Sequence, residues 1–214
     1  AALTFDDGPH PESTPRLLEI LKDHQAHATF FLIGQEAQQH RWLVERIGQA
    51  GHAVGNHSWD HKSFPLLNGR ERRAQIRACN KAIAPYGQRI FRPPYGDQTL
   101  ASRLDALLMR HQVITWNRVA YDWLDHDADW IADKIVSKIT PGDVILFHDT
   151  LYTMIEERYA DREPVFEAVK MIIERIGDRF RFVTIPELFR YGRPRRQIWR
   201  KKTDPDWLNK LKLR

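Results

Sequence analysis

The sequence predicts an α/β fold, a distorted or incomplete (β/α) barrel of about seven parallel strands. Short apolar runs bounded by turn residues alternate with longer segments whose apolar residues recur at helical spacing, as at Leu17, Leu18 and Leu21. Strict alternation requires crossover connections, which make neighbouring strands parallel. Seven such units favour an incomplete barrel over a closed eight-fold one, with an open doubly wound sheet as the alternative.

The predicted elements follow one another along the chain in strand and helix order. The expected strands are residues 2–5, 28–33, 52–54, 90–91, 113–116, 144–147 and 180–183. The expected helices are residues 15–24, 36–50, 70–83, 99–110, 129–139 and 164–176. Thr14 suits a helix N-cap before Pro15, and Gly51 and Gly177 suit helix ends.

Length and composition indicate one globular domain. The 214 residues, 42% of them hydrophobic, are enough for one sizeable core. Cys79 is the single cysteine, so no intramolecular disulfide is possible. No stretch approaches the roughly 18 apolar residues of a transmembrane helix. The chain opens in an apolar run with no export signal, and we interpret it as trimmed, with any targeting signal outside it.

Basic residues concentrate at the C-terminal end. Residues 190–214 hold ten Lys or Arg against Asp204 and Asp206, a local charge of +8, so residues 1–189 carry −3 of the total of +5. Such an extension can contact an anionic envelope polymer, pack back on the body or remain solvated without a partner. Nucleic acid is not the expected partner, because its binders carry a basic stripe on the folded domain itself.

Polar residues follow most of the predicted strands at the same end. Because the carboxyl ends of parallel strands meet at one face, we expect these side chains to lie together. They are Asp6, Asp7, His57, His61, Arg92, Asp122, His148 and Asp149.

Two of these motifs suggest a metal site. Asp6 and Asp7 precede a Gly-Pro breaker, which lets two adjacent carboxylates serve one cavity, although the same residues often form only a turn. His57 and His61 have the i, i+4 spacing that places two imidazoles on one face of a helical turn. One carboxylate and two imidazoles can hold a divalent ion, although two histidines at this spacing also occur by chance.

Two further motifs allow both a functional and a structural interpretation. Arg92 begins an Arg-Pro-Pro-Tyr-Gly turn whose prolines would hold the guanidinium and the following N–H in place, yet it could be a solvated surface turn. His148 ends an apolar run and could equally be a hydrogen-bonded core histidine.

The ordered motifs TFDDGP, HSxxH, RPPYG, DW and LFHD resemble those of the polysaccharide deacetylase family, carbohydrate esterase family four, also called the nodulation-protein deacetylase homology domain. The resemblance implies a catalytic domain at residues 1–189 with a basic extension at 190–214. It implies metal-dependent hydrolysis of the N-acetyl group from amino sugars in a polysaccharide or oligosaccharide, such as chitin or peptidoglycan, with release of acetate. It also implies a location at the cell envelope or outside the cell.

Residue by residue, the resemblance implies that Asp7, His57 and His61 bind the metal. Zinc is the expected ion, with cobalt, nickel and ferrous iron as alternatives. The residues implied to contact the substrate are Tyr95, through its backbone N–H on the oxyanion, and Trp123 and Leu146, as an apolar wall for the acetyl methyl group.

The resemblance also implies four catalytic residues. Asp6 would be the general base, paired with Arg92, and His148 the general acid, tuned by Asp122.

Two departures from the family pattern bear on the substrate. Val119 stands three positions before Asp122, where the family often has an acidic residue, and residues 150–163 are longer and more polar than the minimal pattern. Loops at this face shape the groove, so substrate choice stays open. The alternatives are a deacylase of a small or lipid-linked N-acyl substrate, indicated by a closed pocket, and a non-catalytic carbohydrate-binding homologue.

Overall fold

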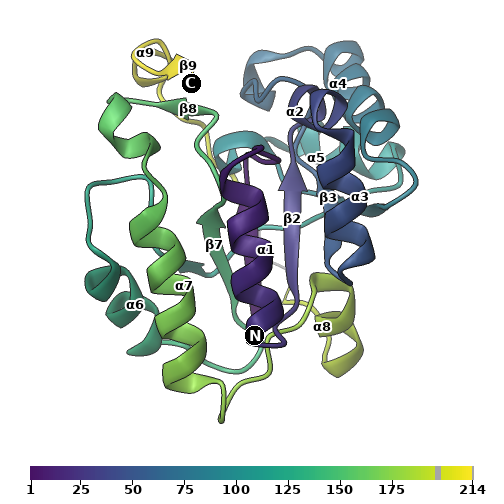
Figure 1. Cartoon of the computed structure of the whole chain (residues 1–214). Helices are drawn as coiled ribbons and strands as arrows, with labels where there is room; N and C mark the ends of the chain where they lie inside the picture. Colours follow the sequence, from purple (N-terminus) through teal and green to yellow (C-terminus); the bar gives the residue numbers. More distant parts are fainter. Residues whose placement is uncertain (196–198, 214) are drawn as a thin grey trace.

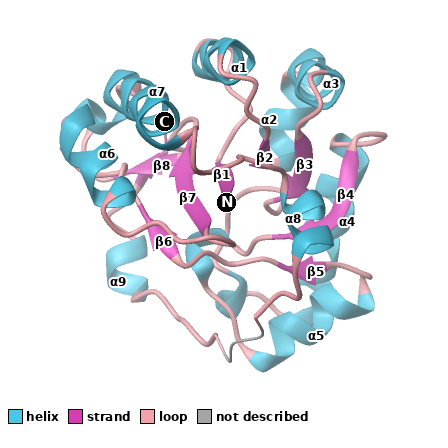
Figure 2. Ribbon diagram, turned by 90° about the horizontal axis from the view of Figure 1, so that it is seen from below, coloured by secondary structure: helices cyan, strands magenta, loops and turns pink. Residues whose placement is uncertain are grey.

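The computed structural model describes residues 1–195 and 199–213. Seven strands form one sheet in the order β5-β4-β3-β2-β1-β7-β6, and every neighbouring pair is parallel. The strands are β1 (Ala2–Asp6), β2 (Ala28–Leu32), β3 (Ala53–Asn56), β4 (Gly87–Phe91), β5 (Gln112–Val113), β6 (Arg118–Val119) and β7 (Val144–His148). Figure 2 shows them along an arc, which confirms the predicted incomplete barrel of parallel strands.

Helices line the outer side of this arc. Figures 1 and 2 show α6, α7, α1 and α3 ranged along it, and α8 at the lower end of the sheet. The helices are α1 (Ser13–Asp23), α2 (Gly34–Gln39), α3 (Arg41–Gln49), α4 (Gly69–Ala82), α5 (Leu100–Leu108), α6 (Ala128–Val136), α7 (Glu163–Ile176), α8 (Ile185–Tyr191) and α9 (Pro205–Leu208). None of the helices in the described ranges is long and apolar enough to cross a bilayer.

Strand residues alternate between the two faces of the sheet, and this alternation positions the site. On the outer face, Phe5 stacks on Phe30 and Phe147, with ring centroids 5.3 and 5.7 Å apart. On the inner face, a smaller apolar cluster with Ile185 of α8 fills the amino end of the barrel. The inner residue at the carboxyl end of β1 is therefore Asp6, which faces a cavity instead of the core.

The seventh strand is not where the sequence predicted it. Residues 180–183 form no strand, although Val183 N donates to the Ala1 carbonyl, the Ala1 amino group donates to the Arg181 carbonyl and His27 N donates to the Phe182 carbonyl. The strand beside β7 is β6 instead, so Asp122 follows the sixth strand and not the fifth. With two half-buried residues, β6 lacks the apolar run by which the other strands were found.

Two helix predictions were also wrong in detail. Residues 36–50 form two helices, α2 and α3, which meet at His40. Thr14 lies inside α1, whose N-cap is Glu12. Its hydroxyl accepts a hydrogen bond from His10 N and donates to Asp149 Oδ2 at 2.5 Å, so it serves a tertiary contact rather than a cap.

The C-terminal segment, by which we mean residues 199–213, packs on the body of the domain. Its last strand, β9 (Lys212–Leu213), pairs antiparallel with β8 (Thr153–Met154). Figure 1 shows β8, β9 and α9 together near the carboxyl ends of the large sheet. Neither short strand had been predicted.

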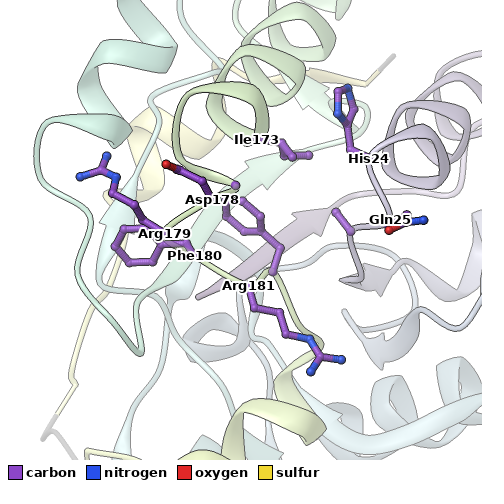
Figure 3. Close-up of a pocket in the computed structure, with 10 residues that line it drawn as sticks. His24, Gln25, Ile173, Asp178, Arg179, Phe180 and Arg181 are labelled. Carbon is purple, nitrogen blue, oxygen red and sulfur yellow. The ribbon is translucent and has the colours of Figure 1, made fainter.

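A cavity of about 320 Å³ lies between the end of α1 and the end of α7 (Figure 3). Its labelled lining residues include His24, Ile173 and Arg181. It lies at the amino end of the sheet, away from the predicted site residues.

Candidate active site

A cavity of about 360 Å³ at the carboxyl ends of the strands brings the predicted site residues together. Eight of the ten line it: Asp6, Asp7, His57, His61, Tyr95, Trp123, Leu146 and His148. The other two, Arg92 and Asp122, lie directly behind it, bonded to Asp6 and His148 respectively.

Asp6 and Asp7 reach the same cavity because the backbone turns between them. Asp6 is the last residue of β1, and Asp7 has a φ of 75°. Neighbouring residues in a regular strand would point to opposite faces, and this left-handed conformation cancels that alternation. Both residues are 3% exposed.

Asp7 and two histidines form a set that fits a divalent cation. Asp7 Oδ1 lies 3.4 Å from His57 Nε2 and 3.1 Å from His61 Nε2. Ligand atoms bound to one ion at about 2.0–2.2 Å lie roughly 3–3.5 Å apart, which matches these separations. Asp7 Oδ1 is buried and accepts no hydrogen bond from the described part of the chain, so it is an acceptor aimed at a cation-sized space.

The protonation of this set also suits a metal. His57 Nδ1 lies 2.7 Å from the Arg92 carbonyl oxygen. Because a carbonyl only accepts, His57 Nδ1 donates this hydrogen bond, and Nε2 is left on the side of Asp7. Burial alone would raise the pKa of the Asp7 carboxyl, but His61 and His57 hold it well below its usual range. Asp7 is therefore an anion, as a ligand must be.

The two histidines converge through a loop and not through the expected helical turn. Residues 57–61 contain no helix, and Ser58 and His61 have φ values of 71° and 57°. Asn56 Oδ1 accepts from Ser58 N at 2.9 Å, and the Ser58 hydroxyl accepts from His61 N at 3.1 Å. These local bonds hold the rings of His57 and His61 at 5.0 Å between centroids.

Arg92 fixes one oxygen of Asp6. Its guanidinium is fully buried and donates from Nη1 to Asp6 Oδ1 at 2.7 Å and to the Thr4 hydroxyl at 2.8 Å. It also lies 4.1 Å from the centre of the Phe31 ring. Asp6 Oδ2 remains on the metal-binding side, 3.8 Å from His57 Nε2.

Asp122 orients His148 on the other side of the cavity. Its Oδ1 lies 3.1 Å from His148 Nδ1, and its Oδ2 accepts from His148 N at 2.7 Å. Burial alone would lower the pKa of His148, but Asp122, followed by Asp7 and Asp6, raises it to about 9. With Nδ1 turned to Asp122, Nε2 is left for the cavity, where the Trp123 ring lies edge-on at 5.6 Å.

The sequence did not reveal Arg162 as part of the site. Its guanidinium donates to Asp122 Oδ2 at 2.5 Å, to the Asp122 carbonyl at 2.8 Å and to the His148 carbonyl at 3.0 Å. Arg162 stands 40 residues from Asp122 in the polar stretch before α7, where no local pattern marks it.

Residues after His148 also reach the site. Asp149 is fully buried beneath the Gly8 turn, and burial raises the pKa of its carboxyl to about 7. Tyr152 N donates to Asp7 Oδ2 at 3.0 Å, which fixes the oxygen that does not face the histidines. Asp149 was among the polar residues expected at this face, whereas the length and polarity of residues 150–163 were the only sequence signal for the Tyr152 contact.

Left-handed backbone conformations gather around the cavity. Of the seven non-glycine residues with positive φ among those described, five lie in it or beside it: Asp7, Ser58, His61, Tyr95 and Tyr121. Such conformations cost free energy and persist where the surrounding structure imposes them, as it often does at functional sites.

A cation site between a buried carboxylate and a charged imidazole suits the attack of water on an unreactive bond, so the fold and the site define a metal-dependent hydrolase. Residues 1–114 match the family model described as polysaccharide deacetylase. The chain is 34% identical over 200 residues to a peptidoglycan-N-acetylglucosamine deacetylase of Bacillus cereus, covering 91% of this chain and 70% of the relative.

Two further comparisons agree with this match. Identity to a chitooligosaccharide deacetylase of Sinorhizobium fredii is 36% over 154 residues, covering 69% of this chain and 70% of the relative. A crystal structure of a peptidoglycan N-acetylglucosamine deacetylase aligns with a TM-score of 0.82 at 33% identity, over 91% of this chain and 89% of the other. The chain belongs to the polysaccharide deacetylase family, carbohydrate esterase family four, whose deacetylases are metal-dependent.

Proposed function

We propose that this deacetylase removes the N-acetyl group from N-acetylglucosamine in glycans of the peptidoglycan or chitooligosaccharide type. The observation that carries the proposal is the Asp7, His57 and His61 triad placed between Asp6 and His148 in one cavity. Relatives named for these two substrate types support the choice of an N-acetylated amino sugar.

Asp7, His57 and His61 would hold the cation. Zinc is the proposed ion because two imidazoles and a carboxylate are a frequent zinc donor set, although cobalt, nickel and ferrous iron accept the same donors. When bound, the ion polarises the acetamide carbonyl and acidifies the attacking water. Tyr152 N and the Arg92 carbonyl hold Asp7 and His57 in position for binding.

Asp6 acts as the general base. Arg92 engages Oδ1 and leaves Oδ2 toward the triad, where a water molecule can give up its proton as it attacks the carbonyl carbon. The backbone N–H of Tyr95 would donate to the oxygen of the tetrahedral intermediate. This N–H donates no hydrogen bond to another group among the residues that the structure describes, so it is available for that role.

His148 acts as the general acid. Collapse of the tetrahedral intermediate needs a proton on the departing nitrogen, because an amide anion is too basic to leave unaided. Asp122 keeps His148 protonated and turns Nε2 toward the cavity. Trp123 and Leu146, which also line the cavity, would border the methyl group of the acetamide.

The test is acetate release from chitooligosaccharides, peptidoglycan and acetylxylan, measured after chelation and again after addition of zinc or cobalt. Release that needs the metal and is confined to the N-acetylated glycans is the expected result. Release from acetylxylan alone would show an O-deacetylase instead. No release from any substrate, with metal bound and the fold intact, would favour first a small N-acyl substrate and then a non-catalytic carbohydrate-binding role.

Binding of an anionic envelope polymer by residues 190–214 stays a prediction. Salt-dependent binding of such a polymer, compared with a variant that carries glutamine at the exposed Lys202 and Lys210, would test it.

A further inference from the structure

The C-terminal segment borders the active-site cavity. Lys201, Thr203, Trp207 and Leu211 line the same space as the residues that bind the cation. Figure 1 shows α9 and β9 beside β8 at the end of the sheet where β7 terminates. The segment is therefore a wall of the cavity as well as an extension of the chain.

The start of the segment is attached to the turn that carries Tyr95. Lys201 Nζ donates to the Tyr95 carbonyl at 2.7 Å. Thr203 donates twice to Asp97 Oδ1, from its backbone N at 2.8 Å and from its hydroxyl at 2.7 Å. Asp97 is fully buried, so these hydrogen bonds are made largely out of contact with water.

An aromatic contact strengthens this attachment. Trp199 Nε1 donates to the Gly96 carbonyl at 2.9 Å, and the Trp199 ring lies 5.3 Å from that of Trp116, which also lines the cavity. Gly96 has a φ of 68°, and a side chain there would collide with Trp116 at 2.7 Å. The absence of a side chain at Gly96 therefore leaves room for Trp116 beside this turn, and Trp199 packs against Trp116.

The end of the segment is attached to the polar stretch after β7. Thr153 pairs with Leu213, and Met154 pairs with Lys212, in the antiparallel β8–β9 ladder. The Tyr95 hydroxyl lies 3.3 Å from the Thr153 hydroxyl. The segment is therefore connected both to the turn after β4 and to the stretch after β7, and it bridges two sides of the cavity.

We propose that the C-terminal segment is a specificity wall, which makes the enzyme act on short glycans or chain ends rather than on the interior of a long chain. The inference rests on the proposed function and names the substrate class within it. The cavity of about 360 Å³ lies near the small end of ligand sites, which span about 300 to 1,000 Å³. With the acetamide held beside the triad, the wall would stand in the path of a chain that continues beyond the sugar on that side.

Trp207 gives this wall a surface that suits a sugar. Its ring lies edge-on to that of Tyr95, with centroids 6.2 Å apart, and remains 36% exposed beside the cavity. Aromatic rings bind the apolar C–H faces of sugars while leaving hydroxyls free for water or polar groups. Trp207 would thus contact the sugar that carries the acetamide or its neighbour.

The test compares acetate release from N-acetylated chitotriose and from glycol chitin, a soluble hydroxyethyl derivative of the polymer of N-acetylglucosamine. The double variant Trp199→Ala, Thr203→Ala loosens the wall without removing any residue of the chain. We expect it to raise the ratio of kcat/KM for polymer to kcat/KM for trimer by roughly 10-fold. This ratio is the decisive quantity, because a disturbed Tyr95 turn would slow the reactions of polymer and trimer to the same extent and leave the ratio unchanged. Lys202→Ala, in the same segment but exposed, is the control and should leave the ratio unchanged.

A cross-link gives a readout that does not depend on activity. Thr153 and Leu213 are paired residues of an antiparallel ladder, so cysteines at both positions lie within reach of a disulfide. Oxidation should close this link in the folded chain, and the oxidised enzyme should act on chitotriose while losing activity on the polymer. An unchanged substrate ratio in the loosened variant, or a linked enzyme that still acts on the polymer, would overturn the proposal. Failure of the wild-type enzyme, the loosened variant and the linked variant on both substrates would instead overturn the proposed function. Closure of the disulfide would still show where the segment lies.

Discussion

Arg162 donates hydrogen bonds to both the side-chain and the backbone oxygen of Asp122, at 2.5 and 2.8 Å, in a region that is almost fully buried. Asp122 in turn contacts His148 through Nδ1 and the backbone amide. The position of the proposed general acid therefore depends on a residue that does not line the cavity.

This dependence predicts the effect of Arg162→Lys. Lysine keeps the charge but loses the planar guanidinium that engages two oxygens at once, so His148 should lose its fixed orientation. We expect kcat to fall about 10-fold with little change in KM, because substrate contacts stay intact. Arg158→Lys is the matched control, since Arg158 lies in the same stretch but its ion pairs are exposed. Equal effects of the two substitutions would contradict a positioning role for Arg162.

The pH profile should report the titration of His148. Its imidazolium must be present for proton donation, so kcat should hold below its pKa and fall as pH rises through it. That pKa is raised to about 9, in part by Asp7 and Asp6, whose charge a bound cation offsets, so the alkaline limb should lie at about 9 or somewhat below.

Asp122→Asn tests the same assignment. Loss of the carboxylate charge should move the alkaline limb roughly 1–3 units toward lower pH. His148→Ala should lower kcat by about 10²- to 10⁴-fold, the range for loss of a positioned acid. If the alkaline limb of the kcat profile lay at the same pH in Asp122→Asn as in the wild-type enzyme, the limb would belong to a group other than His148.

Substitution of Asp6 and of His57 should separate catalysis from metal binding. Asp6→Asn keeps an oxygen that can accept from Arg92 but removes the base, so kcat should fall by about 10²- to 10⁴-fold with the metal content unchanged. His57→Ala should lose both activity and metal. Metal content by elemental analysis beside acetate release distinguishes the two, and a fully active Asp6→Asn enzyme would exclude Asp6 as the base.

His52 predicts how stability depends on pH, away from the active site. The ring is 8% exposed, and its Nδ1 accepts from Ala28 N at 3.2 Å, which requires an unprotonated nitrogen. Burial, with a smaller effect of His27, lowers its pKa from 6.5 to about 4. Between these values the unfolded chain binds more protons than the folded one, so the stabilisation is present above pH 6.5 and is lost as pH falls toward 4.

The expected loss of unfolding free energy from this histidine is about 3 kcal/mol across that window. Urea unfolding at several pH values measures it. His52→Gln retains an acceptor without the titration and should flatten the dependence over the same range. If the unfolding free energy of His52→Gln depended on pH as strongly as that of the wild-type chain, groups other than His52 would be responsible for the dependence.

The strands that the sequence predicted well are those buried on both faces. β1, β2 and β7 are apolar runs that end in turn signals, and the register between them follows from the parallel sheet. β6 was missed because it has only two residues, and residues 180–183 were mistaken for a strand because their apolar side chains fill the core without a ladder. Apolar content predicts that a segment is buried, but a buried segment need not pair with a neighbouring strand.

Eight of the cavity-lining residues could be predicted because they belong to compact motifs near strand ends, and these motifs resemble those of the family. Arg162 and the C-terminal segment could not, since their contacts with Asp122 and with the Tyr95 turn join positions 40 and about 100 residues apart. The spacing of His57 and His61 indicated a shared face correctly but for the wrong reason. A loop with two left-handed residues brings them together instead of a helix.

Asp6 and His148 are register partners on the neighbouring strands β1 and β7. The distance between these two residues, the proposed base and the proposed acid, is thus set by backbone hydrogen bonds of the sheet, whereas Trp207 and the rest of the C-terminal wall lie outside the sheet. The sheet therefore sets the geometry of the reaction, whereas the segments around the cavity that would contact the substrate can be exchanged without changing it. Grafting residues 199–213 together with their partner strand β8 (Thr153–Met154) onto a relative should transfer substrate preference while leaving the chemical step of the recipient enzyme intact.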